Sequence, residues 1–192
     1  PGTYTASETP QAGYSASAWG GDCAANGAVT LAPGDHKTCT ITNDDNAPAL
    51  HLRKVVVNDN GGTALNTEWT LAAAGPTPLS GTTPVDSGPS FDAGTYDLSE
   101  SGGPAGYTAS AWVCTGTGTQ VDDDTVTVGL GQEATCTITN DDNAPALHLR
   151  KVVVNDNGGT ALNTEWTLAA AGPTPLSGTT PVDSGPSFDA GT

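Results

Sequence analysis

The stretch TCTITNDDNAPALHLRKVVVNDNGG, residues 38–62, occurs again without a single change at residues 135–159. The identity extends further, so that residues 38–95 and 135–192 match throughout. Nearer the N-terminus, GTYTASETPQAGYSASAW (from Gly2) is similar to GTYDLSESGGPAGYTASAW in the middle of the chain. A period of about 97 residues is too long for a solenoid repeat and matches the size of one small domain.

The repeat predicts a tandem array of domains of about 97 residues. Residues 47–143 would form one complete copy, residues 1–46 the second half of a preceding copy, and residues 144–192 the first half of a following copy. We expect the chain to be a window from a longer array. The two end segments should together make one domain, either through a peptide that continues or through strand exchange between separate chains.

Composition favours short strands over helices. The 192 residues include 25 glycines and 14 prolines, and only 35% of them are hydrophobic. Within the complete copy, runs rich in Val, Thr and Tyr alternate with turn signals, as expected for a β-sandwich. We therefore predict an all-β, Ig-like sandwich. The expected strands are residues 49–58, 67–73, 95–101, 107–115, 125–128 and 135–140.

The chain is strongly acidic. Five Lys and Arg against 21 Asp and Glu give a net charge of −16. Such a surface is repelled by phosphate backbones and by anionic lipid, so neither nucleic acid nor a membrane is expected as a partner. The sequence also contains no apolar run of about 20 residues, the length that a membrane-spanning helix needs.

Strand alternation predicts three polar side chains on the core face of the complete copy. Lys54 shares its face with Leu50 and Leu52, because side chains alternate along a strand. By the same parity, Glu100 and Asn140 point inward near the ends of their own strands. Burial should lower the pKa of the lysine and raise that of the glutamate.

Two interpretations of this trio are open from the residues alone. The first is a buried Lys54–Glu100 ion pair capped by Asn140. The second is amide exchange, in which the Lys54 amine attacks the Asn140 carboxamide, Glu100 shuttles protons and ammonia leaves. The end segments hold the equivalent residues, with Glu8 and Asn43 in one and Lys151 in the other.

The segment GTYDLSESGGPAGY, residues 94–107, resembles the YxLxET-xAPxGY box of CnaB/SpaA-type domains, the prealbumin-like modules of bacterial pilins and surface adhesins. The resemblance implies a prealbumin-like sandwich. It also implies an intramolecular isopeptide bond between Lys54 and Asn140, with Glu100 as its catalyst. In the same way, Lys151 and Asn43 would be bonded with Glu8 as catalyst. Ser101 stands where the box usually has Thr.

Each copy carries two cysteines, Cys23 with Cys39 and Cys114 with Cys136. Their spacing is not a zinc pattern, and the sequence has no CxxC motif. We predict one disulfide within each pair, which implies an extracellular or cell-surface location. Free buried thiols in a cytosolic protein are the alternative.

Acidic residues lie at the junctions between copies, where they could bind calcium. The NDDN sequence places Asp44 and Asp45 at one junction and Asp141 and Asp142 at the other. Carboxylates suit calcium, although such segments are common as turns and solvated linkers. These four aspartates are therefore candidate calcium ligands, and no other cofactor is expected.

Three function classes remain to be weighed. The repetition favours a structural role as a pilus, filament or surface stalk, whose partners are neighbouring copies arranged head to tail. The alternative is an adhesin module that binds a glycan or protein, with linkers stiffened by calcium. Because the sequence has no GxSxG, HExxH, P-loop or dinucleotide motif, we expect no enzymatic activity beyond self-crosslinking.

Overall fold

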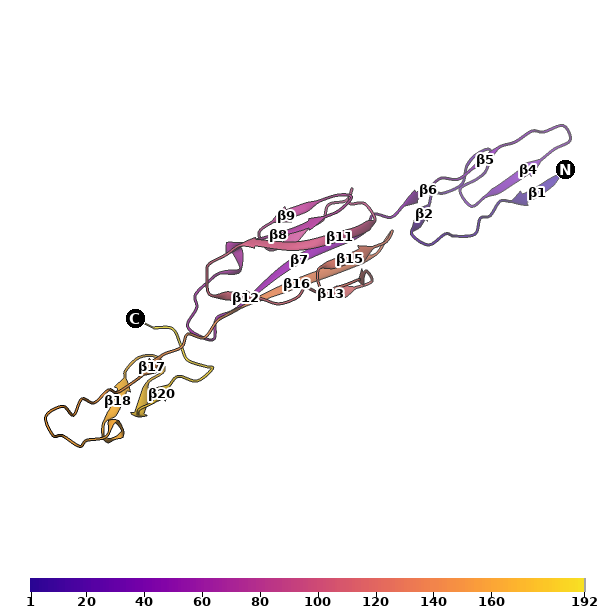
Figure 1. Ribbon diagram of the computed structural model, residues 1–192. Helices are drawn as coiled ribbons and strands as arrows, with labels where there is room; N and C mark the ends of the chain where they lie inside the picture. The colour runs from indigo at the N-terminus through magenta and orange to yellow at the C-terminus, as the bar shows by residue number, and fades with distance from the viewer. Residues whose placement is uncertain (192) are drawn as a thin grey trace.

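The computed structural model describes residues 1–191. The chain is an elongated row of three parts, with the N-terminus at one end and the C-terminal segment at the other (Figure 1). The middle part contains two five-stranded sheets, whereas the outer parts contain only two-stranded sheets. The molecule is almost entirely β, as composition predicts. No helix among the described residues is long and apolar enough to cross a membrane.

The central part is a β-sandwich. One sheet has the strand order β10-β7-β16-β12, with β13 also paired to β16, and the other has the order β14-β15-β11-β8-β9. The strands of this part are β7 (Ala49–Val57), β8 (Trp69–Ala74), β9 (Leu79–Gly81), β10 (Val85–Asp86), β11 (Gly94–Gly102), β12 (Tyr107–Ala109), β13 (Val113–Gly116), β14 (Thr119–Gln120), β15 (Thr125–Val128) and β16 (Glu133–Asp142). A single 3-10 turn, η1 (Asn66–Glu68), precedes β8.

The first and last strands of the sandwich lie side by side. β7 and β16 pair in parallel, from Ala49 opposite Glu133 to Val57 opposite Asp141. All the other strand pairs of the sandwich are antiparallel. This one parallel pair brings together residues that are far apart in the sequence, and it positions the polar trio described below.

The core lies between the two sheets. Alternation along β7 and β11 buries every second side chain, so that Leu50, Leu52, Tyr96 and Leu98 are almost fully enclosed. The other hydrophobic side chains of this core cluster are Leu71, Ala73, Val85, Phe91, Trp112, Val126, Val128, Ala134, Cys136 and Ile138. The inward face that the sequence predicts for each main strand is therefore confirmed.

Two features of the sandwich differ from the sequence-based expectation. The strand predicted at residues 107–115 is wrong as a single element, because β12 and β13 are separated at residues 110–112. There the chain leaves the regular ladder and the Trp112 N–H donates to the Asp123 carbonyl oxygen, which turns the indole into the core. Strands β9, β10 and β14 are also present, and the sequence did not indicate them.

The outer parts have little sheet of their own. The N-terminal segment pairs β1 (Gly2–Thr5) with β4 (Ala28–Leu31), β2 (Tyr14–Ala16) with β6 (Asn43–Asp45), and β3 (Gly20–Gly21) with β5 (Cys39–Thr40). The C-terminal segment pairs β17 (His148–Leu149) with β20 (Val182–Asp183) and β18 (Thr167–Ala170) with β19 (Leu176–Thr179), and it includes the 3-10 turn η2 (Asn163–Glu165).

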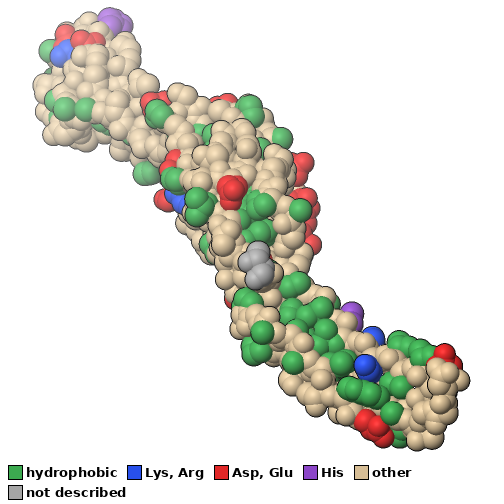
Figure 2. All heavy atoms as spheres, turned by 90° about the vertical axis from the view of Figure 1, so that its left-hand side faces the viewer, with side chains coloured by type: hydrophobic (Ala, Val, Ile, Leu, Met, Phe, Trp, Pro, Cys, Tyr) green, Lys and Arg blue, Asp and Glu red, His purple; other side chains and the backbone are tan. Residues whose placement is uncertain are grey.

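These outer segments expose side chains that their equivalents in the sandwich bury. Tyr4 is 58% exposed, whereas the matching Tyr96 is 0% exposed. Trp166 is 38% exposed, whereas the matching Trp69 is 3% exposed. Figure 2 shows hydrophobic and basic side chains gathered on the C-terminal segment, in the lower part of the view. Within one chain each end segment has only two-stranded sheets, so these side chains have no opposing sheet to cover them.

Candidate functional site

Lys54 is buried in the middle of β7. Its side chain has no exposed surface, and its Nζ lies 2.6 Å from Glu100 Oε2. The Nζ also lies 4.7 Å from the centre of the Trp69 ring. Burial lowers the pKa of Lys54, because the effect of desolvation exceeds that of the hydrogen bond and charge of Glu100. The site therefore favours a neutral amine more than water does.

Glu100 reaches this amine from the opposite sheet. It lies on β11, next to Leu71 of β8, and its side chain keeps 13% of its surface exposed. The contact with Lys54 thus bridges the two layers of the sandwich. A carboxylate that touches both a buried amine and the edge of solvent can accept a proton from that amine.

Asn140 completes the trio on β16. It is 3% exposed and lies opposite Val56, two positions beyond the pair formed by Ile138 and Lys54. Residues two apart on a strand share a face, so Asn140 and Lys54 both project inward from neighbouring strands. Among the described residues, the buried Oδ1 of Asn140 has no hydrogen-bond partner. Such an unsatisfied buried group costs about 1–3 kcal/mol, which marks the carboxamide as unusual.

These three residues have the chemical types needed for amide exchange. A neutral lysine is a nucleophile, a carboxamide carbonyl is an acceptor, and a carboxylate beside the amine can move protons between them. The structure brings Lys54 and Glu100 into contact, with Asn140 on the same face of the adjacent strand.

The comparisons with known proteins bear on this arrangement. The chain matches the SpaA-type prealbumin-like fold domain over residues 1–41, 45–138 and 142–191. It belongs to this family. The resemblance seen in residues 94–107 is thereby confirmed, and so is the prealbumin-like fold that it implies.

Comparison with curated proteins finds no match. Among solved structures, the chain is similar to the major pilin protein T3.2 of Streptococcus pyogenes serotype GAS13637. The two are 15% identical with a TM-score of 0.41, and the match covers 73% of this chain and 66% of the pilin. The chain thus spans just under two thirds of that pilin.

The two outer segments of this prealbumin-like protein contain the equivalents of Lys54, Glu100 and Asn140. The glutamate and the asparagine lie in the N-terminal segment, and the lysine lies in the C-terminal segment. In the N-terminal segment, Asn43 Nδ2 donates to Glu8 Oε2 at 3.0 Å, and both residues are exposed. In the C-terminal segment, Lys151 Nζ lies 4.6 Å from the centre of the Trp166 ring, close to the 4.7 Å between Lys54 Nζ and the Trp69 ring. Figure 1 places the two segments at opposite ends of the molecule, so one chain does not bring Lys151 to its own Glu8 and Asn43.

Both predicted disulfides are confirmed. Cys23 is bonded to Cys39, and Cys114 is bonded to Cys136. The second bond joins β13 to β16 at residues that lie directly opposite each other in the ladder. It fixes the strand that carries Asn140 to its neighbour.

Asp142 anchors the turn of residues 58–62, and sequence reasoning did not assign this role to it. Its carboxylate accepts hydrogen bonds from the backbone N–H groups of Asp59, Asn60 and Gly62. Burial alone would raise the pKa of Asp142, but these amides outweigh it and hold the pKa below its usual value. Gly62 allows this close approach, since an added Cβ would collide with the Tyr107 hydroxyl and with the carboxylate. The contacts span 80 or more residues, so no local signal could reveal them.

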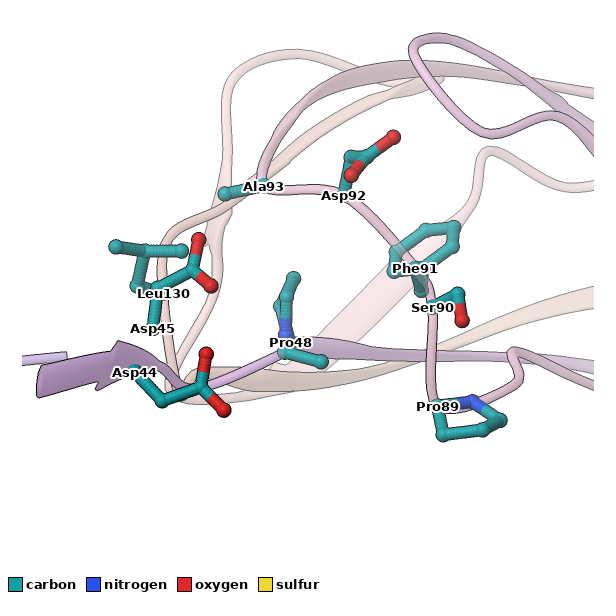
Figure 3. Close-up of a pocket in the computed structure, with 10 residues that line it drawn as sticks. Asp44, Asp45, Pro48, Pro89, Ser90, Phe91, Asp92, Ala93 and Leu130 are labelled. Carbon is teal, nitrogen blue, oxygen red and sulfur yellow. The ribbon is translucent and has the colours of Figure 1, made fainter. Parts of the chain in front are cut away.

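The acidic residues considered for calcium fall into two groups. Oxygen atoms of Asp59, Asp141 and Asp142 lie within 4.8 Å of one another, and the sequence had not indicated Asp59. Asp44 and Asp45 lie together at the other junction, where they line a cleft (Figure 3). The Asp142 oxygens are already used by backbone amides, so this carboxylate has a structural role whether or not a cation binds. Calcium at either junction stays a prediction.

Proposed function

We propose that this chain is a structural part of an extracellular bacterial fibre, in which each complete domain is stiffened by an isopeptide bond between Lys54 and Asn140 and by a disulfide. The observation that carries the proposal is the buried contact between Lys54 Nζ and Glu100 Oε2, with the Asn140 carboxamide on the adjacent strand. Membership of a prealbumin-like family supports the same proposal.

The proposed step conserves atoms and needs no oxidant. Lys54 Nζ gives a proton to Glu100 and attacks Cγ of Asn140, which forms a new C–N bond. The bond from Cγ to Nδ2 then breaks, and the nitrogen leaves as ammonia after Glu100 returns a proton to it. The product is a secondary amide, which replaces a buried titratable amine with an uncharged group.

The position of this bond suits a fibre under tension. The central part begins with β7 and ends with β16, and these two strands pair in parallel. Pulling the two ends of the part in opposite directions therefore loads the β7–β16 ladder in shear. A covalent link between residues 54 and 140 would carry that load directly, so the chain between them would be protected from extension.

We propose domain boundaries at residues 46/47 and 143/144, with neighbouring copies as head-to-tail partners. Disulfides persist in oxidising compartments, which supports display at the cell surface. The only chemistry assigned to the chain is its own crosslinking, which occurs once per domain.

Intact mass spectrometry tests the proposal directly. The folded, reduced protein should weigh less than its sequence requires by one ammonia for the central domain. Lys54→Ala should restore the full mass of that domain. Lys37→Ala is the matched control, because Lys37 is a lysine outside the trio whose Nζ donates to the Thr30 carbonyl oxygen. A wild-type protein of unmodified mass that is fully folded by circular dichroism would overturn the crosslink and leave the ion pair.

A further inference from the structure

The linker residue Asn46 is bonded to the N-terminal segment through both its backbone and its side chain. Its N–H donates to the Gly13 carbonyl oxygen at 2.8 Å, and its Oδ1 accepts a hydrogen bond from the Ser15 hydroxyl at 2.6 Å. At the second junction, Asn143 makes the two equivalent bonds at 2.8 and 2.7 Å. The repeat therefore fixes each linker asparagine to the copy that precedes it.

The first linker asparagine is also bonded to the sandwich that follows it. Its carbonyl oxygen accepts a hydrogen bond from the Gly131 N–H at 2.7 Å. Three residues later, the Ala49 N–H donates to the Gln132 carbonyl oxygen at 2.8 Å. Only two residues lie between these attachment points, and one of them is the buried Pro48, whose ring fixes φ. The linker therefore has little freedom to rotate.

A side-chain contact accompanies these bonds at the first junction. Leu130, on the turn before β16, packs against Gly13, where an added Cβ would lie 2.7 Å from the Leu130 Cβ. Figure 3 shows Leu130 at this junction, beside the strand end that carries Asp44 and Asp45. A side chain at position 13 would push the sandwich away from the copy before it.

The junction with the C-terminal segment is held through a different element. There, the Ala190 N–H donates to the Asn60 carbonyl oxygen at 2.8 Å. An added Cβ at Gly61 would lie 2.8 Å from the Ala190 carbonyl oxygen, so a glycine again allows the close approach. The turn is itself fixed, because three of its amides donate to the Asp142 carboxylate. Asp142 directly precedes Asn143, so the turn and the linker are held by the same strand end.

The two kinds of contact are compatible within one joint. By the repeat, Ala190 corresponds to Ala93 and Asn143 corresponds to Asn46. One contact uses the loop that contains Ala93 or Ala190, and the other uses the turn of Leu130 and Gly131, so they do not compete for residues. A joint between two complete copies can therefore form both. The linker alone would let one copy rotate against the next, and each added contact removes part of that freedom.

We propose that the junctions between copies are rigid joints, in which the turn of residues 58–62 and the linker asparagine dock the following copy at a fixed angle. The partner of this surface is the next copy of the repeat, recognised through the loop that contains Ala190. Asp142 is a positioning residue of the joint, because it acts on that loop through the turn. The joint lies between copies and does not depend on the crosslink within the sandwich.

Gly61→Ala in the 192-residue chain tests the turn contact, because the added methyl group would collide with Ala190. The exchange protection of the Ala190 amide should fall by about tenfold or more. Residual dipolar couplings of the sandwich and of the C-terminal segment should fit one alignment tensor in the wild-type chain and two tensors in the variant. Gly158→Ala is the matched control. It lies at the same position of the identical turn in the C-terminal segment, with φ of +86° against +90°, and an added Cβ would meet no atom within 4 Å.

Gly13→Ala tests the linker contact in the same way. It should lower the exchange protection of the Gly131 amide by about tenfold or more and should separate the alignment of the N-terminal segment from that of the sandwich. Gly34→Ala is the matched control in the same segment, with φ of +84° against +82° and no atom within 4 Å of an added Cβ. It should leave the protection of Gly131 within about twofold of the wild-type value.

The wild-type chain already gives a decisive result. Separate alignment tensors, or unprotected amides at Ala190 and Gly131, would overturn the rigid joints whether or not the sandwich is crosslinked. Equal effects of a glycine variant and its control would assign the loss to backbone strain and would also overturn them.

The amides of Asp59, Asn60 and Gly62 report whether the turn survives in Gly61→Ala. If they stay protected while Ala190 does not, the contact between copies has been removed and the proposal is supported. If they lose protection as well, the alignment decides. Two tensors would support the turn as the docking surface, and a single tensor would overturn it.

Discussion

Asn43 Nδ2 donates a hydrogen bond to Glu8 Oε2 at 3.0 Å in the N-terminal segment. In the sandwich, the corresponding carboxylate of Glu100 instead accepts a hydrogen bond from Lys54 Nζ at 2.6 Å. Where the lysine is present the glutamate contacts the nucleophile, and where it is absent the glutamate contacts the leaving group. One carboxylate position thus reaches both ends of the proposed proton transfer, which explains why a single glutamate would be sufficient.

The first prediction concerns Glu100. Glu100→Gln should keep a hydrogen bond to Lys54 but should be unable to take its proton, so crosslinking of the central domain should slow by about 10²–10⁴-fold. The measurement is the rate of ammonia loss by mass spectrometry after refolding from denaturant. Ser99→Ala, on the outward face of the same strand, is the control and should crosslink at the wild-type rate. A normal rate in Glu100→Gln would show that the carboxylate does not relay protons.

The second prediction concerns Asn140. Asn140→Asp should still bond to Lys54, but water rather than ammonia should leave, which gives a distinct mass. Asn140→Ala should leave the domain without the link and should lower its free energy of unfolding by about 4.5 kcal/mol, the loop-closure entropy of a crosslink between residues 54 and 140. Denaturant melts of the two variants provide the comparison. Equal stability of both would mean that the link adds nothing to the fold.

The third prediction concerns the disulfide of the sandwich. Because Cys114 and Cys136 are 22 residues apart, replacing both with serine should cost about 3 kcal/mol of unfolding free energy. Ammonia loss from the central domain should continue, since the Lys54–Glu100 contact comes from β7 and β11. A double variant that folds yet no longer crosslinks would show instead that the disulfide positions Asn140.

Sequence reasoning located Lys54, Glu100 and Asn140 because strand parity is a local property. A side chain that shares its face with Leu50 and Leu52 must point inward wherever the strand lies. Such parity does not tell whether an opposing sheet is present. For this reason parity does not distinguish Tyr4, which is largely exposed, from the equivalent Tyr96, which is buried.

Other features depend on long-range packing and could not be predicted. The cation–π contact of Lys54 with Trp69 requires knowing that β7 faces β8 across the core. The break between β12 and β13 arises because Trp112 turns into that core, and composition gives no sign of it. The role of Asp142 was interpreted as calcium binding, because the sequence does not show that residues 59–62 fold back onto it.

The last prediction concerns this turn and its dependence on pH. Asp142→Ala should expose the amides of Asp59, Asn60 and Gly62, whose hydrogen-exchange protection should fall by about tenfold or more. Asp141→Ala is the matched control, since Asp141 is exposed and none of these amides donates to it. Loss of protection in both variants would assign the effect to the charge of the junction rather than to this carboxylate.

Acid should have the same effect as the substitution. The pKa of Asp142 is lower in the folded chain than in the unfolded chain, where it is about 3.9. The anchoring therefore contributes stability that is fully present above that value and is lost as the pH falls through the lower folded pKa. Wild-type protection at residues 59–62 should decline below about pH 4, once the intrinsic pH dependence of exchange is removed, whereas that of Asp142→Ala should stay flat. A parallel decline in both proteins would show that another group controls the turn.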